Sequence, residues 1–287
     1  MKVLELFAGT RSIGKAFERR GHEVYSIEWD KHFENIDLYA DIMTVTADDI
    51  IQRFGRPDVI WASPDCTTFS IAAISHHRRK NAVTGNLDPV SDYARFCDAV
   101  DQHVLQLIRE LKPKFYFIEN PRGGMRKMPW MQGLPRYTVT YCQYGDTRMK
   151  PTDIWTNHPD PQFKPICKNG DPCHERSPRG ATIRKAKQMG IILPRGGTIA
   201  LKNSMERSKI PHALCEHIVD ICEGGGYPMI ELKQCPKCGR RPLLGYAYGK
   251  YFIVGQVGGC GVCDTFGEMH ASREQEAEAW NRRADNG

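Results

Sequence analysis

Two polar side chains that follow apolar strands could carry out covalent chemistry together. Cys66 lies in the stretch VIWASPDCTTFS, just after an apolar strand expected over residues 58–63. Glu119 and Asn120 close a longer apolar strand expected over residues 114–121. A cysteine that only packs would be expected inside an apolar run, whereas a loop thiol can be a nucleophile where a basic neighbour or a helix N-terminus lowers its pKa. We therefore interpret Cys66 as reactive, with a structural cysteine as the alternative.

Apolar runs that alternate with helical patterns indicate the elements that must position these residues. Strands and helices in alternation imply an α/β fold with a doubly wound, mostly parallel sheet, in which ligands bind beyond the carboxyl ends of the strands. The polar residues of interest lie at such ends. Strands are expected over residues 2–7, 23–29, 58–63 and 114–121, with a further strand near Asp41 and Ile42, and helices over 13–20, 48–55, 91–111 and 211–223.

The first strand leads into a segment suited to a nucleotide-like cofactor. LELFAGTRSIG places Gly9 and Gly14 between a strand and a helix, where glycines let the backbone approach a ligand and the helix offers free N–H groups. Glu28 follows the second strand, 19 residues after Gly9, where such folds bind ribose hydroxyls. Trp29 could stack on a purine or simply pack, and Asp41 could accept from an adenine amino group. No P-loop lysine motif follows, so S-adenosylmethionine, which has no pyrophosphate, is favoured over a triphosphate or NAD.

A thiolate, a carboxylate and a methyl donor suit one reaction. Attack of the Cys66 sulfur on C6 of a pyrimidine would make C5 nucleophilic, while Glu119 stabilises the intermediate at N3 and the exocyclic amine. C5 would then take the methyl group. Loss of the C5 proton and β-elimination would release the enzyme.

At these motifs the sequence resembles the DNA (cytosine-5)-methyltransferases, most closely their compact phage-type branch. LFAGTRSIG resembles the cofactor motif of the family, ASPDCTTFS its nucleophile motif, and ENP its Glu-Asn-Val motif. YGDTRMK resembles the Arg-x-Arg motif, and RSKIPHALCEHIV the final helix that completes the cofactor pocket. The resemblance spans roughly residues 1–223, in the order of the family. Asp65, Thr67 and Pro121 depart from the usual proline, glutamine and valine, which leaves the loop geometry and the transferred group open.

The resemblance implies a Rossmann-like methyltransferase that acts on a cytosine flipped out of double-stranded DNA. The catalytic residues that it implies are Cys66, Glu119, Asn120 and Arg148. The cofactor-binding residues that it implies are Phe7, Ala8, Gly9, Thr10, Gly14, Glu28, Trp29, Asp41, Ile42 and Pro64.

Five segments are expected along the chain. They are a catalytic core at residues 1–155, a short target-recognition region at 156–205, a helix completing the core at 206–223, a linker at 224–230 and a zinc ribbon at 231–287. Candidate DNA contacts are Ser70, Lys150, Arg179, Arg184, Lys185 and Lys187, and the cations among Arg179–Lys187 could equally be plain surface charges. Cys167, Cys173 and His174 could hold a metal, but their spacing fits no common site and a fourth ligand is missing.

The C-terminal cysteines form the strongest metal signal in the chain. CPKC contributes Cys235 and Cys238, and CGVC contributes Cys260 and Cys263, with 21 residues between the two pairs. Four thiolates so arranged make a tetrahedral structural zinc site, and unrelated free thiols are the alternative. The intervening segment alternates like a hairpin. The region resembles the restriction-alleviation zinc-ribbon family, including the tail SREQEAEAWNRR, which implies a docking accessory rather than catalysis.

Composition is consistent with this interpretation and excludes few classes. The chain has 287 residues, a net charge of +6 and eleven cysteines, with no apolar stretch long enough to cross a membrane and no signal peptide at its first residues. We expect a cytoplasmic, bacterial or phage-encoded monomer that binds S-adenosylmethionine, Zn²⁺ and DNA, for DNA modification or protection from restriction. Alternatives are the same scaffold acting on RNA or transferring another one-carbon group, and a catalytically silent DNA-binding anti-restriction protein.

Overall fold

The structure is a computed structural model in which the chain divides into two compact units, Met1–Gly224 and Gly225–Gly287. It describes residues 1–168, 171–174, 188–190, 206, 208–224, 233–239, 243–247, 250–254 and 273–286. The described residues include no helix that is both long and apolar enough to pass through a membrane.

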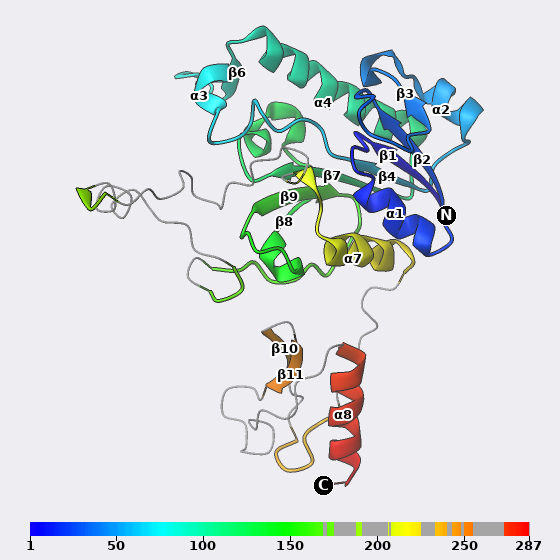
Figure 1. Cartoon of the computed structure of the whole chain (residues 1–287), viewed down its shortest axis with the longest axis vertical. Helices are drawn as coiled ribbons and strands as arrows, with labels where there is room; N and C mark the ends of the chain where they lie inside the picture. Colours follow the sequence, from blue (N-terminus) through cyan, green and yellow to red (C-terminus); the bar gives the residue numbers. More distant parts are fainter. Residues whose placement is uncertain are drawn as a thin grey trace. The chain divides into compact units, whose positions relative to one another are not determined.

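The larger unit is built on a seven-stranded sheet with the strand order β3-β2-β1-β4-β7-β9-β8 (Figure 1). The strands from β3 to β7 pair in parallel, and β9 runs antiparallel to both of its neighbours. The mostly parallel α/β sheet predicted from the sequence is therefore confirmed. The strands are β1 (Lys2–Leu6), β2 (Glu23–Glu28), β3 (Leu38–Tyr39), β4 (Val59–Ala62), β7 (Phe115–Pro121), β8 (Arg136–Thr140) and β9 (Pro151–Thr156).

Helices cover both faces of this sheet, with α2 and α4 on one face and α1 and α7 on the other (Figure 1). Their first turns are fixed by side chains at two places: Ser91 accepts a hydrogen bond from the Ala94 N–H before α4, and Thr46 forms a capping box with Asp49 before α2. The helices are α1 (Ser12–Arg19), α2 (Ala47–Arg53), α4 (Asp92–Leu111) and α7 (His212–Cys222).

The strands are buried on both faces, so each face has its own apolar core. Leu4 and Ile60 pack with Leu107 of α4 in one cluster. Val59 and Ile218 of α7 belong to the other cluster, together with aromatic side chains of β7 and α1. Burial on both faces is why the sequence shows β4 as a continuous apolar run, VIWA, rather than as an alternating one.

Several short elements of this unit were not predicted from the sequence. They include β8, β9 and an antiparallel hairpin that follows a four-residue helix. Among them, Arg78 of β5 contacts the loop that carries Cys66, through Thr68. Their bounds are α3 (Ile74–His77), β5 (Arg78–Lys80), β6 (Leu87–Pro89), and the 3-10 turns η1 (Ile42–Thr44), η2 (Met125–Lys127), η3 (Pro129–Met131) and η4 (Tyr141–Tyr144).

The smaller unit contains the predicted hairpin, formed by β10 (Leu243–Ala247) and β11 (Lys250–Val254), and the helix α8 (Arg273–Asn286). Trp280 of α8 is buried and donates its indole N–H to the Lys233 carbonyl at 2.8 Å. The Cys235–Cys238 pair lies on a turn closed by a 2.8 Å hydrogen bond from Gly239 N to Cys235 O. Cys260 and Cys263 lie outside the described residues, so the zinc ribbon remains a prediction.

Candidate active site

Cys66 lies on a tight turn directly beyond the carboxyl end of β4. The N–H groups of Phe69 and Ser70 donate to its carbonyl at 3.1 and 2.8 Å, which makes residues 66–70 one helical turn. The N–H of Thr67 donates to the Asp65 carboxylate, a local bond typical of aspartate at turns. Cys66 is half-buried at this position, so its sulfur remains within reach of a ligand.

Glu119 and Asn120 reach the same sheet edge because β4 and β7 are neighbouring parallel strands, with Ala62 opposite Ile118. Asn120 is fully buried and donates its side-chain N–H to the Pro64 carbonyl at 3.1 Å, which fixes the start of the cysteine loop. Glu119 is also buried. The structure therefore brings the predicted nucleophile and the predicted carboxylate to adjacent strand ends.

Three residues that sequence reasoning missed hold the cysteine loop in place. Arg78 is fully buried and donates to the Thr68 carbonyl at 3.1 Å and to Asp98 of α4 at 2.6 Å, while its guanidinium lies 4.1 Å from the centre of the Phe69 ring. A Cβ at Gly123 would lie only 2.4 Å from the Phe69 carbonyl, so this approach requires glycine. Adjacent glycines in the sequence after β7 were the available signal.

The electrostatic environment of Cys66 differs from the sequence expectation. Burial, the charge of Glu119 and then the charge of Asp65 raise the pKa of the Cys66 thiol to about 11, while the Lys150 ammonium and a local backbone hydrogen bond act in the opposite direction. The predicted basic neighbour is thus present, but burial and two carboxylates outweigh it. The thiol is consequently protonated near neutral pH in the free protein.

Glu119 is held by a buried tyrosine. The Tyr141 hydroxyl donates to Oε1 of Glu119 at 2.8 Å, and burial together with the Glu119 charge raises the pKa of Tyr141 well above its usual range. Tyr141 therefore remains a hydrogen-bond donor. Lys150 lies against the same side chain, with its Nζ 4.4 Å from the centre of the Tyr141 ring.

Arg148 is buried in the loop between η4 and β9, where it forms an ion pair with Asp146. The Arg148 Nε lies 2.9 Å from Oδ1 of Asp146, and its backbone N–H donates to the same oxygen at 2.7 Å. Burial acts to raise the pKa of Asp146, but these hydrogen bonds outweigh it and hold the pKa below its ordinary value. The predicted arginine is therefore pre-positioned by an aspartate on its own loop.

A cavity of about 380 Å³ opens beside the cysteine loop, between the ends of the first strands and α4. Four carboxylates and no cationic side chain are found among its lining residues. Asp101 is buried, and its Oδ2 finds no hydrogen-bond partner among the described residues. The lining residues are Phe7, Ile27, Glu28, Trp29, Ala40, Asp41, Ile42, Asp65, Tyr93, Phe96, Cys97, Val100 and Asp101.

These properties fit S-adenosylmethionine, which carries a sulfonium and an ammonium group. An acidic, partly apolar cavity with an unpartnered buried carboxylate favours a cationic ligand with N–H donors. It disfavours a pyrophosphate, whose charge would face all four acids. Burial and the nearby Asp98 charge raise the pKa of Asp101 well above its ordinary value, which a bound cation would reverse.

Glu28 organises the rim of this cavity through backbone N–H groups. Its Oε2 accepts from Gly9 N at 2.9 Å, and its Oε1 accepts from the N–H groups of Trp29 and Asp30 at 3.0 Å each. Gly9 has a φ of +47°, which suits glycine. Three of the roughly four acceptor positions of the carboxylate are occupied, which leaves one for the ribose hydroxyl that the sequence predicts as its partner.

The other predicted residues lie at different distances from the cavity. Phe7, Trp29, Asp41 and Ile42 line it, and Trp29 is 72 % exposed. Ala8 and Pro64 are adjacent in sequence to the lining residues Phe7 and Asp65, but neither lines the cavity itself, and Gly9 and Thr10 are not among the lining residues either. Gly14 instead faces the buried Glu5, whose Oε2 would lie 2.4 Å from a Cβ at this position. The predicted DNA contacts Arg179, Arg184, Lys185 and Lys187 lie outside the described residues.

Comparisons with known proteins found a family model, a sequence relative and solved structures to which this chain is similar. Residues 1–128 match the family model of the C-5 cytosine-specific DNA methylases. A probable DNA (cytosine-5)-methyltransferase of Frog virus 3 (isolate Goorha) is 29% identical over 232 residues, which are 77% of this chain and 100% of the viral protein. Among solved structures, the Entamoeba histolytica methyltransferase EhMeth has a TM-score of 0.47 and 11% identity, covering 78% of this chain and 98% of EhMeth. A putative DNA modification methyltransferase encoded within an E. coli prophage has a TM-score of 0.41 and 18% identity, covering 54% of this chain and 46% of the other.

Proposed function

We propose that this chain is a DNA (cytosine-5)-methyltransferase that methylates C5 of a flipped-out cytosine in DNA through a covalent adduct on Cys66. The match of residues 1–128 to the C-5 cytosine-specific DNA methylase model and the similar viral protein support this proposal. The observation that carries the proposal is the meeting of Cys66 and Glu119 at adjacent strand ends, beside an acidic cavity suited to S-adenosylmethionine. The cofactor supplies the methyl group to C5.

The proposed reaction begins when the flipped-out cytosine binds beside Glu119. Tyr141 already occupies Oε1 of Glu119, so we assign Oε2 to N3 of the cytosine. The Cys66 thiol gives up its proton, which Oε2 of Glu119 and N3 of the cytosine then share. The sulfur forms a bond to C6, and the electrons of the C5–C6 double bond make C5 nucleophilic. After methyl transfer the C5 proton leaves to a base, the double bond reforms, and the sulfur–C6 bond breaks. The shared proton returns to the sulfur when the adduct breaks.

The raised pKa of Cys66 gives this order of events a physical reason. The Glu119 charge opposes formation of the thiolate in the free protein. Once Glu119 shares a proton with N3, that repulsion weakens and the thiolate forms more readily. The nucleophile is therefore activated by the base that it attacks, which limits side reactions of Cys66 in the absence of DNA.

Asn120 and Arg148 act around this pair in the proposed mechanism. Asn120 fixes the start of the cysteine loop by donating its side-chain N–H to the Pro64 carbonyl. Arg148, aligned by Asp146, faces the base or the cysteine loop. We infer double-stranded DNA as the substrate, a monomer as the active species, and DNA modification or protection from restriction as the use, with the predicted zinc ribbon as an accessory.

The test is to incubate the protein with labelled S-adenosylmethionine and duplex DNA, then digest the DNA and identify the nucleosides. We expect 5-methylcytosine, no product from Cys66→Ser, and unchanged cofactor binding by that variant. Cys222→Ala is the matched control, because Cys222 is buried in α7 away from the cysteine loop. Cofactor binding without any modified cytosine would refute the proposal, and label in RNA or a different substituent at C5 would favour the alternative substrates.

A further inference from the structure

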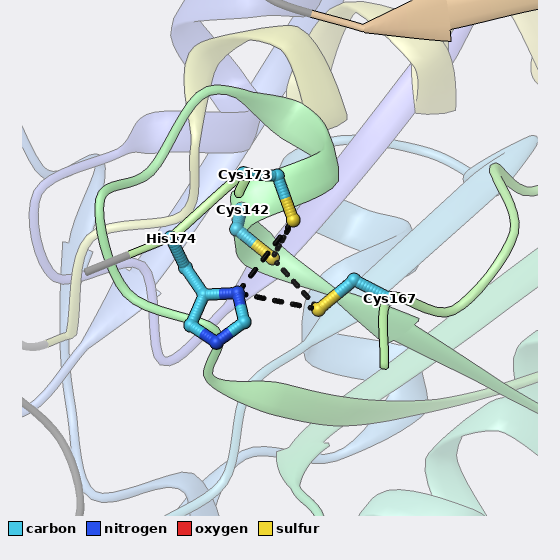
Figure 2. A group of neighbouring side chains, drawn as sticks. All are labelled: Cys142, Cys167, Cys173 and His174. Carbon is cyan, nitrogen blue, oxygen red and sulfur yellow. Dashed lines mark hydrogen bonds between the residues drawn. The ribbon is translucent and has the colours of Figure 1, made fainter. Parts of the chain in front are cut away.

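A second group of thiols gathers outside the active site. Cys142 lies on η4, and Cys167, Cys173 and His174 follow β9 in the chain (Figure 2). The three sulfurs and the Nδ1 of His174 all lie within 4.8 Å of one another. The sequence showed three of these residues but no fourth ligand, and that expectation is corrected because Cys142, 25 residues before Cys167, fills the gap.

The spacing of the four atoms matches the edges of a small tetrahedron. Cys142 Sγ lies 3.3 Å from Cys167 Sγ and 3.6 Å from Cys173 Sγ, and His174 Nδ1 lies 3.7 and 3.6 Å from the sulfurs of Cys167 and Cys173. Zinc with bonds of about 2.3 Å to sulfur and 2.0–2.1 Å to nitrogen gives edges of about 3.8 and 3.6 Å. The side chains point toward one centre in Figure 2.

The surroundings of the cluster hold its members in place. Cys142 and Cys167 are buried, and Cys173 and His174 are half-buried. The Cys167 N–H donates to the Thr140 hydroxyl at 3.0 Å at the end of β8. The side-chain N–H of Gln143 points to Cys173 Sγ at 3.5 Å, a contact that favours a thiolate. The 3-10 turn η4 and the chain after β9 thus present the four donors together.

We propose that Cys142, Cys167, Cys173 and His174 bind one structural Zn²⁺. Three thiolates and one imidazole are a donor set typical of zinc, and four protein ligands leave no position for a substrate or water. Burial raises the pKa of Cys142 when no metal is bound, so zinc binding releases protons from these thiols. The proposal does not depend on methyl transfer.

The ion would fasten the chain after β9 onto the active-site loops. Cys142 directly follows Tyr141, the donor to Glu119, and precedes the loop with Asp146 and Arg148. The Cys142 Sγ also approaches the Met149 carbonyl at 4.0 Å. The described residues 157–168 and 171–174 contain no strand or α-helix, so a metal would add an anchor to the hydrogen bonds that Lys164 and Cys167 make with Tyr144 and Thr140.

The decisive experiment uses the full chain with all four predicted ribbon cysteines replaced, Cys235→Ser/Cys238→Ser/Cys260→Ser/Cys263→Ser. This variant keeps the new cluster intact and removes the competing site. After exposure to Zn²⁺ and removal of the excess, elemental analysis should find one zinc per chain. A folded variant that retains no zinc overturns the proposal. A disulfide between Cys142 and Cys167, detected by counting the free thiols, overturns it as well.

A second arm locates the bound ion. Adding Cys173→Ser and His174→Ala to the ribbon-free variant should abolish zinc retention, while adding Cys222→Ala, a buried cysteine of α7, should leave one zinc per chain. Co²⁺ loaded into the ribbon-free variant should give the visible ligand-field and sulfur-to-metal bands of a tetrahedral thiolate site. Zinc retention that survives loss of both Cys173 and His174 overturns the assigned ligand set.

Discussion

Replacing Glu119 by glutamine should make Cys66 more reactive in the free protein. The substitution keeps the shape of the side chain and an oxygen that can accept from Tyr141 at the position of Oε1. It removes only the negative charge. Because that charge is the second cause, after burial, of the raised pKa of Cys66, the thiol pKa should fall in Glu119→Gln.

The size of the effect follows from the thiolate fraction. With a pKa of about 11, roughly one thiol in a thousand is ionised at about pH 8, whereas the ordinary value of 9.0 gives about one in ten. If every cause of the raised pKa were removed, the thiolate fraction would therefore rise by about a hundredfold at most. Burial stays in the variant, so we expect an increase of roughly tenfold in the thiolate fraction.

Alkylation by iodoacetamide measures this fraction directly. The rate at the peptide that contains Cys66 is followed by mass spectrometry as a function of pH, with Glu110→Gln on the exposed side of α4 as the matched control. Asp65→Asn should give a smaller increase, and Lys150→Met a decrease, in line with their ranks among the charges acting on the thiol. An unchanged or higher apparent pKa in Glu119→Gln would refute the electrostatic reasoning.

Three further predictions concern the framework and the cavity. Burial raises the pKa of Glu5 from 4.5 to about 7. The stability that protonated Glu5 contributes is therefore present at low pH and is lost as the pH rises from 4.5 to about 7. Over this range the unfolding free energy of the wild type should fall by up to about 3 kcal/mol relative to Glu5→Gln. Trp29→Ala should weaken binding of S-adenosylmethionine roughly two- to tenfold in calorimetry and leave the melting temperature unchanged, because Trp29 is 72 % exposed. Arg78→Met should cost about 3–5 kcal/mol in urea unfolding by stranding buried Asp98, with partial recovery in Arg78→Met/Asp98→Asn.

The elements that carry the cofactor and nucleophile motifs were predictable from the sequence because their signals are local. β4 and β7 are apolar runs followed by or ending in polar residues, β1 leads into a glycine turn, and α4 shows helical spacing between its cap and the Lys112-Pro113 stop. β8 and β9 lack such a signal. RYTVT and PTDIWT are short and mixed in polarity, and their burial comes from pairing in the sheet.

The reacting groups of the candidate site were predictable from the sequence, but the residues that hold the cysteine loop in place were not. Cys66 and Glu119 stand next to recognisable strands, whereas Arg78 lies in a basic run, HHRRK, that is typical of an exposed loop. Only the folded chain places its guanidinium against Thr68 and Asp98. Cys142 was missed for the same reason, because contact between residues 25 positions apart and on different elements leaves no periodicity to detect.

Asp65 gives the departure from the family motif a physical meaning. Its carboxylate accepts from the Thr67 N–H within the cysteine loop and from the Tyr93 hydroxyl of α4 at 3.0 Å; a proline side chain offers no such acceptor. Asp65 and Tyr93 also line the acidic cavity, and the Asp65 charge opposes ionisation of Cys66. A cationic cofactor in that cavity compensates this charge, so the same carboxylate that shapes the loop links cofactor binding to the reactivity of the thiol. The free thiol is therefore held back by two carboxylates, one facing the proposed position of the base and one facing the proposed position of the cofactor.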